Sequence, residues 1–128
     1  MYAEDDPFSR ELMKMIAENI LGAPDITIFD SSLDFMEKLK TLSRHPDVIL
    51  LDIHMKPQNG FEVLKMLRAD VDYGSVKVIA LTASVMNEEI AALKKSGFDG
   101  AIGKPFDIAK FGALMEMILN GQPVWQII

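Results

Sequence analysis

Carboxylates, a hydroxyl group and an ammonium group follow separate apolar segments of this 128-residue chain: Glu4 and Asp5, then Asp52, Thr82 and Lys104. Carboxylates held close together repel one another at neutral pH unless a proton or a cation neutralises them. Mg²⁺ suits such a group, because it binds one or two carboxylates and keeps several waters. With a hydroxyl and a lysine nearby, the cluster fits phosphoryl chemistry. The metal and the lysine would neutralise phosphoryl oxygens, the hydroxyl would bond one of them, and a carboxylate would be the nucleophile.

Short apolar runs that alternate with segments of helical periodicity must position these residues. The runs predict five strands, at 1–5, 25–29, 47–51, 76–82 and 100–103. Between and after them, helical spacing and capping residues predict five helices, at 7–21, 31–43, 59–68, 87–97 and 107–119. In the first helix, Phe8, Leu12, Met15, Ile16 and Ile20 lie on one apolar face, which is expected to be buried, with Asp6 as N-cap and Pro7 in the first turn.

This alternation predicts an α/β fold of the flavodoxin-like (βα)5 type, a doubly wound five-stranded parallel sheet of order 2-1-3-4-5. The apolar runs are continuous rather than alternating, which is typical of strands buried on both faces. In this topology the site lies outside the carboxyl ends of the first and third strands. Asp5 and Asp52 are therefore expected to face each other.

Composition excludes several classes of function. The net charge is -6 and no cluster of Lys and Arg stands out, so direct nucleic-acid binding is not expected. The chain has no cysteine, which excludes disulfides and thiolate metal sites. It has neither a visible secretory signal nor an apolar run of the roughly 20 residues needed to span a membrane. We expect a cytoplasmic protein without membrane contact, with one domain over 1–120 and a tail over 121–128.

Four sequence pieces together resemble the response-regulator receiver domain of two-component and phosphorelay signalling. They are "AEDDP" after the first strand, "VILLDIHM" with "NGFEVL" downstream, "VIALTAS", and "GKPF". Thr82 lies 30 residues and Lys104 lies 52 residues after Asp52, the separations that such domains usually show. Each piece is weak alone, but the four in this order and at these spacings are specific, and they cover essentially the whole chain.

The resemblance implies a role for each matching residue. Asp52 would be the phosphoacceptor. Mg²⁺, or Mn²⁺, would be held by Glu4, Asp5, Asp52 and the backbone carbonyl of His54, with Asp5 a direct ligand and Glu4 acting mainly through water.

The resemblance also assigns roles to residues at the other strand ends and around the pocket. Thr82 would move toward the phosphoryl group and Lys104 would pair with it. Ser84 and Lys56 would line the rim of the pocket. The bond between Lys104 and Pro105 is a candidate cis peptide, since proline lowers the cis penalty.

The resemblance also implies partners and a limited chemistry. The phosphoryl group would come from a sensor histidine kinase or a histidine phosphotransfer protein. The domain would catalyse only its own phosphorylation and slow autodephosphorylation, without acting as a conventional enzyme. Phosphorylation would bias a surface made by the fourth helix, fifth strand and fifth helix, at 87–97, 100–103 and 107–119. That surface would bind an output domain or form a homodimer.

Two departures from the family pattern support an alternative reading. Ala101 stands where such domains usually carry an aromatic residue. Lys56 stands where they usually carry proline, and Pro57 follows one position later. The alternative is a receiver-like binding module that no longer signals by phosphorylation. A third class, an aspartate-nucleophile phosphohydrolase, requires a second aspartate two residues after the nucleophile, where this chain has His54.

The tail "GQPVWQII" is too apolar for a purely solvated end. It is interpreted as the start of a linker, with packing back on the domain and pairing with another chain as the alternatives.

Overall fold

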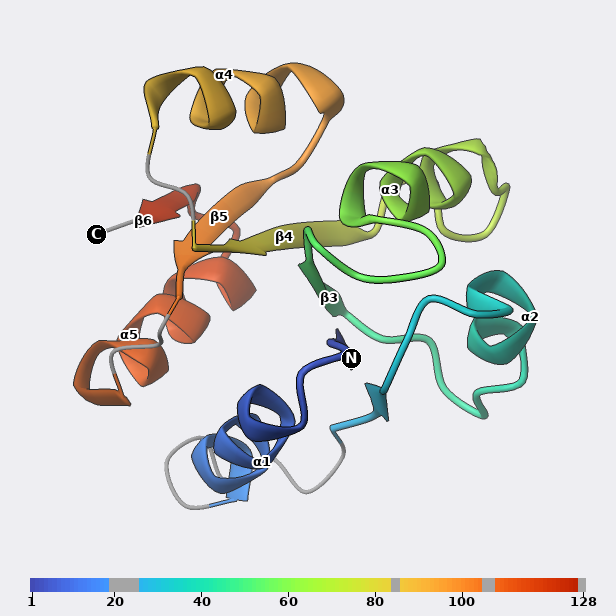
Figure 1. Ribbon diagram of the computed structural model, residues 1–128, viewed down its shortest axis with the longest axis horizontal. Helices are drawn as coiled ribbons and strands as arrows, with labels where there is room; N and C mark the ends of the chain where they lie inside the picture. Colours follow the sequence, from blue (N-terminus) through green and yellow to red (C-terminus); the bar gives the residue numbers. More distant parts are fainter. Residues whose placement is uncertain (19–25, 84–85, 105–107, 127–128) are drawn as a thin grey trace.

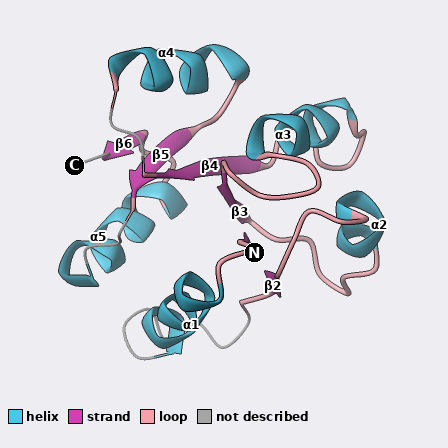
Figure 2. Cartoon of the chain, viewed as in Figure 1, coloured by secondary structure: helices cyan, strands magenta, loops and turns pink. Residues whose placement is uncertain are grey.

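Strands and helices alternate along the chain (Figures 1 and 2). The computed structural model describes residues 1–18, 26–83, 86–104 and 108–126. The elements, in order, are β1 (Tyr2–Ala3), α1 (Pro7–Ile16), β2 (Ile28–Phe29), α2 (Phe35–Lys40), β3 (Val48–Asp52), α3 (Gly60–Ala69), β4 (Lys77–Thr82), α4 (Asn87–Ser96), β5 (Gly100–Gly103), α5 (Ile108–Leu119) and β6 (Val124–Gln126).

All the strand pairs are parallel, and the sheet order is β2-β1-β3-β4-β5-β6. The predicted α/β class and the order of the first five strands are confirmed. The predicted number of strands is one too small, because residues 124–126 return from α5 and pair with β5. A three-residue strand carries too little periodicity to be recognised from sequence alone.

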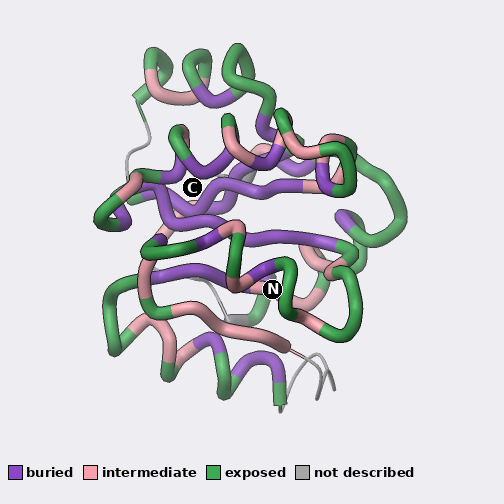
Figure 3. The backbone as a smooth tube through the Cα atoms, turned by 90° about the vertical axis from the view of Figure 1, so that its right-hand side faces the viewer, coloured by how far each residue is buried: buried purple, intermediate pink, exposed green. Residues whose placement is uncertain are grey.

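Helices cover both faces of the sheet, and the strands lie between them (Figures 2 and 3). One apolar cluster joins the sheet to α2, α3 and α4 through side chains such as Leu39, Leu67 and Leu93. The other joins it to α1 and α5 through Met13 and Phe111. The β3 strand is buried along its whole length, which explains its continuous apolar sequence.

Several helix ends follow their local sequence signals. Asp6 accepts a hydrogen bond from the backbone N–H of Ser9 at 2.9 Å, as expected of the N-cap of α1. Asn59 and Glu62 form a reciprocal capping box at the start of α3. Gly97 ends α4 at φ 103°, in the left-handed region that favours glycine. These local signals therefore set the ends of three helices.

The predicted buried face of α1 is partly wrong. Phe8 is 76% exposed and Met15 is 45% exposed, whereas Met13 and Ile16 are fully buried. A face through Phe8 and Met15 and a face through Met13 and Ile16 both have helical spacing. Packing against the sheet buries the face through Met13. Within the described residues, no helix is long and apolar enough to cross a membrane.

Candidate functional site

Three carboxylates converge at the carboxyl ends of β1 and β3. One carboxylate oxygen from each of Glu4, Asp5 and Asp52 lies within 4.8 Å of the other two. The strand register explains this convergence, because Ala3 pairs with Leu51 and the next residue on each strand is therefore Glu4 or Asp52. Glu4 and Asp52 are buried and Asp5 is exposed. The expected approach of the first and third strand ends is thus observed.

Lys104 supplies the positive charge next to these carboxylates. Its Nζ donates to Glu4 Oε1 at 2.7 Å and to Asp52 Oδ1 at 3.3 Å. The lysine side chain is only 19% exposed, and the two carboxylates are almost fully covered. Ion pairs screened from water in this way are stronger than pairs on the open surface. This lysine therefore joins β1, β3 and β5 at one point.

Burial and mutual repulsion change the protonation of the cluster. Burial, and after it hydrogen bonding with Asp52, raises the pKa of Glu4 from 4.5 to about 7 against the opposing effect of Lys104. For Lys104, burial lowers the pKa, but the bond to Glu4 and the charge of Asp52 outweigh burial, so the pKa lies above its ordinary value. The hydroxyl of Tyr2 donates to Glu4 Oε1 at 2.9 Å. The positive charge of Lys104 therefore does not fully offset the negative charge of the buried carboxylates.

Glu4 Oε2 is the atom that most directly calls for a further ligand. It is buried and has no hydrogen-bond partner among the described residues. Such an atom needs either a proton shared with Asp52 or a cation. Three convergent carboxylates are hard oxygen donors, and they fit a divalent ion such as Mg²⁺.

Thr82 lies at the carboxyl end of β4, between the Asp52 strand and the Lys104 strand. It is fully buried, and its backbone carbonyl accepts the N–H of Lys104 at 2.8 Å. Asp52 pairs in register with Leu81, the residue before Thr82. The fold therefore places a hydroxyl group beside the strand end that carries Asp52.

The loop after Asp52 is held by Ser32, one of the two serines that begin the predicted helix at 31–43. The Ser32 Oγ donates to the Gln58 carbonyl at 2.6 Å and accepts the Gln58 N–H at 2.7 Å. The Ser32 N–H donates to the Lys56 carbonyl at 3.2 Å. A cis peptide lies in this loop, between Lys56 and Pro57. The double serine before α2 was the available signal, but its partners lie 26 residues away.

The side chains of His54 and Lys56 are both exposed. The His54 N–H donates to Asp52 Oδ1 at 3.4 Å. Ser84 and the predicted cis bond to Pro105 involve residues outside the described part of the chain.

Gly60 brings the start of α3 against the backbone that carries Asp52. Its N–H donates to the Ile53 carbonyl at 2.9 Å. A Cβ at position 60 would lie 2.9 Å from both the Asp52 carbonyl oxygen and the Ile53 Cα. Only glycine allows this approach.

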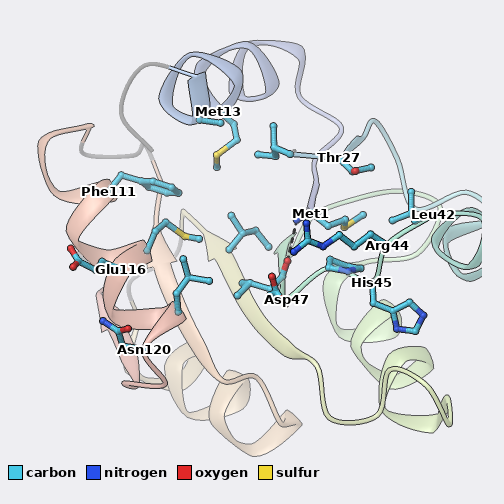
Figure 4. Close-up of a pocket in the computed structure, with 18 of the residues that line it drawn as sticks. Met1, Met13, Thr27, Leu42, Arg44, His45, Asp47, Phe111, Glu116 and Asn120 are labelled. Carbon is cyan, nitrogen blue, oxygen red and sulfur yellow. Dashed lines mark hydrogen bonds between the residues drawn. The ribbon is translucent and has the colours of Figure 1, made fainter. Parts of the chain in front are cut away.

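A large cavity lies at the opposite edge of the sheet (Figure 4). It measures about 1130 Å³ and is bordered by the start of β1, the start of β3, α1 and α5, including Met1, Met13, Asp47 and Phe111. The carboxylates described above do not line it. The candidate site is therefore defined by its charged groups rather than by this cavity.

Comparisons with known proteins identify the family to which this geometry belongs. The family model for the response regulator receiver domain matches residues 1–116. A probable C4-dicarboxylate response regulator, DctR, of Halalkalibacterium halodurans is 34% identical over 113 residues, 88% of this chain and 47% of the relative. The polar-differentiation response regulator DivK of Brucella ovis is 36% identical over 67 residues, 52% of this chain and 54% of the relative. The chain belongs to the response regulator receiver domain family, and it spans about half the length of these relatives.

Solved structures agree on the fold. The receiver domain of a Francisella response regulator superposes with a TM-score of 0.76 at 26% identity, covering 94% of both chains. A two-component response regulator of the LuxR family from Aurantimonas sp. SI85-9A1 superposes with a TM-score of 0.82 at 19% identity, covering 98% of this chain and 87% of that one. The protein is thus a receiver domain of two-component signal transduction.

Proposed function

We propose that this domain accepts a phosphoryl group on the carboxylate of Asp52. The observation that carries the proposal is the convergence of Glu4, Asp5 and Lys104 on Asp52 at the carboxyl edge of the sheet. A nucleophilic carboxylate needs a neighbouring positive charge to approach a phosphoryl group that is itself anionic. Lys104 provides one such charge, and a divalent cation held by the carboxylates provides another.

Each residue of the site has a defined task in this proposal. Glu4, Asp5, Asp52 and the backbone carbonyl of His54 would hold Mg²⁺ or Mn²⁺, which neutralises phosphoryl oxygens when bound. Lys104 pairs with a phosphoryl oxygen and gives up part of its present contact with Glu4. Lys56 would lie on the rim of the site, and the same role is proposed for Ser84 from the sequence alone.

The transfer step forms one bond and breaks another. An Asp52 carboxylate oxygen attacks phosphorus in the phosphohistidine of a sensor kinase or phosphotransfer protein, and the P–N bond breaks. The imidazole nitrogen leaves with the electron pair and takes up a proton. The Thr82 hydroxyl donates a hydrogen bond to a phosphoryl oxygen of the product. Slow hydrolysis reverses the state, because water attacks phosphorus and releases inorganic phosphate and the Asp52 carboxylate.

The direct test combines acetyl phosphate or beryllofluoride with Mg²⁺. Wild type is expected to gain one phosphoryl group by intact mass and to show bound fluoride by ¹⁹F NMR. Asp52→Asn should show neither. Asp30→Asn is the matched control, because Asp30 follows β2 at the same edge but is exposed, and it should behave as wild type. Equal labelling of wild type and Asp52→Asn would show that the phosphoryl group is placed elsewhere.

The receiver-like binding module is the second candidate, favoured by Ala101 and by the shifted Pro57. It predicts a folded domain that binds its partner with equal affinity whether or not Mg²⁺ and a phosphodonor are present. Failure of wild type to bind beryllofluoride would support it over the proposed transfer.

A further inference from the structure

The tail strand β6 is an integral part of the sheet. Helix α5 ends in a paired C-terminal motif, in which the Gly121 N–H donates to the Ile118 carbonyl at 3.0 Å and the Gln122 N–H donates to the Met117 carbonyl at 2.9 Å. Gly121 has φ 80°, which glycine adopts without strain. This turn directs the chain back along the outer edge of β5 (Figure 1).

Gly100 shapes the edge of β5 for this strand. It pairs in register with Val124, and a Cβ at position 100 would fall on the carbonyl oxygen of Val124 and lie 3.0 Å from Ile79 Cδ1. Any side chain there would push β6 away. Val124 is buried on the α5 side of the sheet, where it joins the cluster that contains Phe111.

Trp125, the next residue, points to the opposite face of the sheet. It pairs in register with Ala101 and packs, partly buried, against the cluster that α3 and α4 cover. The Nζ of Lys94 on α4 lies 5.1 Å from the centre of the indole ring, within cation–π range. The indole therefore contacts both the edge of the sheet and α4.

Small residues separate this indole from Thr82. Side chains two apart on a strand share a face, so Thr82 lies on the same face as Ala80, and Gly103 on the same face as Ala101. Thr82 pairs with Gly103, and Ala80 pairs with Ala101. Ala101 stands diagonal to Thr82, a spacing of about 7–8 Å between strand neighbours. On this face of the sheet, Trp125 is the β6 side chain that lies next to Ala101.

We propose that Trp125 is the aromatic positioning residue that couples the Asp52–Thr82 site to the outer surface of α4. The inference rests on the proposed function. A phosphoryl group on Asp52 adds acceptor oxygens, and the Thr82 hydroxyl turns toward them to donate. The vacated volume beside Ala101 is costly to leave empty, and the indole moves inward to fill it. Lys94 then loses its ring contact, which changes the surface that α4 presents.

Trp125 is the only tryptophan of the chain, so its fluorescence reports this movement directly. The experiment measures acrylamide quenching of the whole chain with and without Mg²⁺ and beryllofluoride, and ¹⁹F NMR records binding in the same samples. We expect the quenching constant of wild type to fall by about twofold as the half-buried ring becomes buried. Asp52→Asn should show no bound fluoride and no change in quenching.

Ala101→Val tests the path, because its extra methyl groups fill the space into which the indole would move. This variant should bind beryllofluoride but lose the fluorescence response. Ala92→Val, the same change on the exposed side of α4, should keep both. Amide hydrogen exchange of wild type at 100–103 and 124–126 gives a second readout without mutation, and protection there should rise with beryllofluoride.

The outcomes separate the two proposals. Bound fluoride with unchanged or increased quenching, or a full response in Ala101→Val, overturns the role of Trp125 and leaves the phosphoacceptor proposal standing. Absence of bound fluoride in folded wild type overturns both. If Ala101→Val does not fold, the wild-type quenching and exchange measurements still decide the question.

Discussion

Replacing Glu4 with glutamine tests whether the folded protein disfavours the charged form of the Glu4 side chain. In the folded chain Glu4 has a pKa of about 7 instead of 4.5, because burial and Asp52 disfavour its charge. Between these pH values the folded state holds a proton that the unfolded state has released, so the free energy of unfolding falls as pH rises. At about 1.4 kcal/mol per pH unit, the difference corresponds to about 3 kcal/mol above pH 7. Glutamine has the same shape and avoids this cost.

The assay is urea unfolding of wild type and Glu4→Gln in EDTA across this pH range. Near pH 4.5 the two proteins should be about equally stable, and near pH 8 the variant should be more stable by about 2–3 kcal/mol. Groups away from the cluster contribute equally to both proteins and cancel in the difference. With saturating Mg²⁺ at pH 8 the advantage should shrink or reverse, since the cation stabilises wild type, which keeps all three carboxylates, more than the variant. A pH-independent difference, or a variant less stable at every pH, would refute the assignment of the raised pKa to Glu4.

Three further substitutions probe the site and the contacts that hold the helices and loops around the sheet. Lys104→Met removes the ammonium group that competes with a metal ion for Asp52. The affinity for Mg²⁺, measured by titration calorimetry at about pH 9, should rise about tenfold. An unchanged affinity would show that the charge of Lys104 does not act on the metal. Gly60→Ala should lower the unfolding free energy in urea by about 1–3 kcal/mol, because its Cβ meets the Asp52 backbone; a neutral result would mean that α3 shifts freely. Arg68→Met removes bonds to three backbone carbonyls and to Asp99 at 2.9 Å, and should cost about 2 kcal/mol by the same assay, against no loss in the exposed control Arg44→Met.

Local sequence signals were sufficient for the order of the first five strands and for the strand ends that carry the site. The apolar run that ends at Asp52 predicted a strand buried on both faces, and β3 is buried throughout. Parallel strands present their carboxyl ends at one edge, so alternation alone predicted that Asp5 and Asp52 meet. Capping residues such as Asp6 and Asn59 act within three residues of themselves and were readable for the same reason.

Contacts between distant residues were not readable in this way. Ser32 holds a loop 26 residues away, and Lys104 bonds to Glu4 across 100 residues. The pairing of Trp125 with Ala101 depends on a turn after α5 and on the space left by Gly100. Neither the raised pKa of Glu4 nor the exposure of Phe8 follows from spacing, since both depend on what the assembled layers cover.

The sequence by itself therefore determined the class of fold, the edge of the sheet where the chemistry lies, and the side chains gathered there, because period and strand direction act locally. Only the tertiary structure decided which buried oxygen lacks a partner, which serine restrains the loop after Asp52, and where the indole of the tail is placed. Burial and long-range packing exist only once the sheet and its helices have assembled.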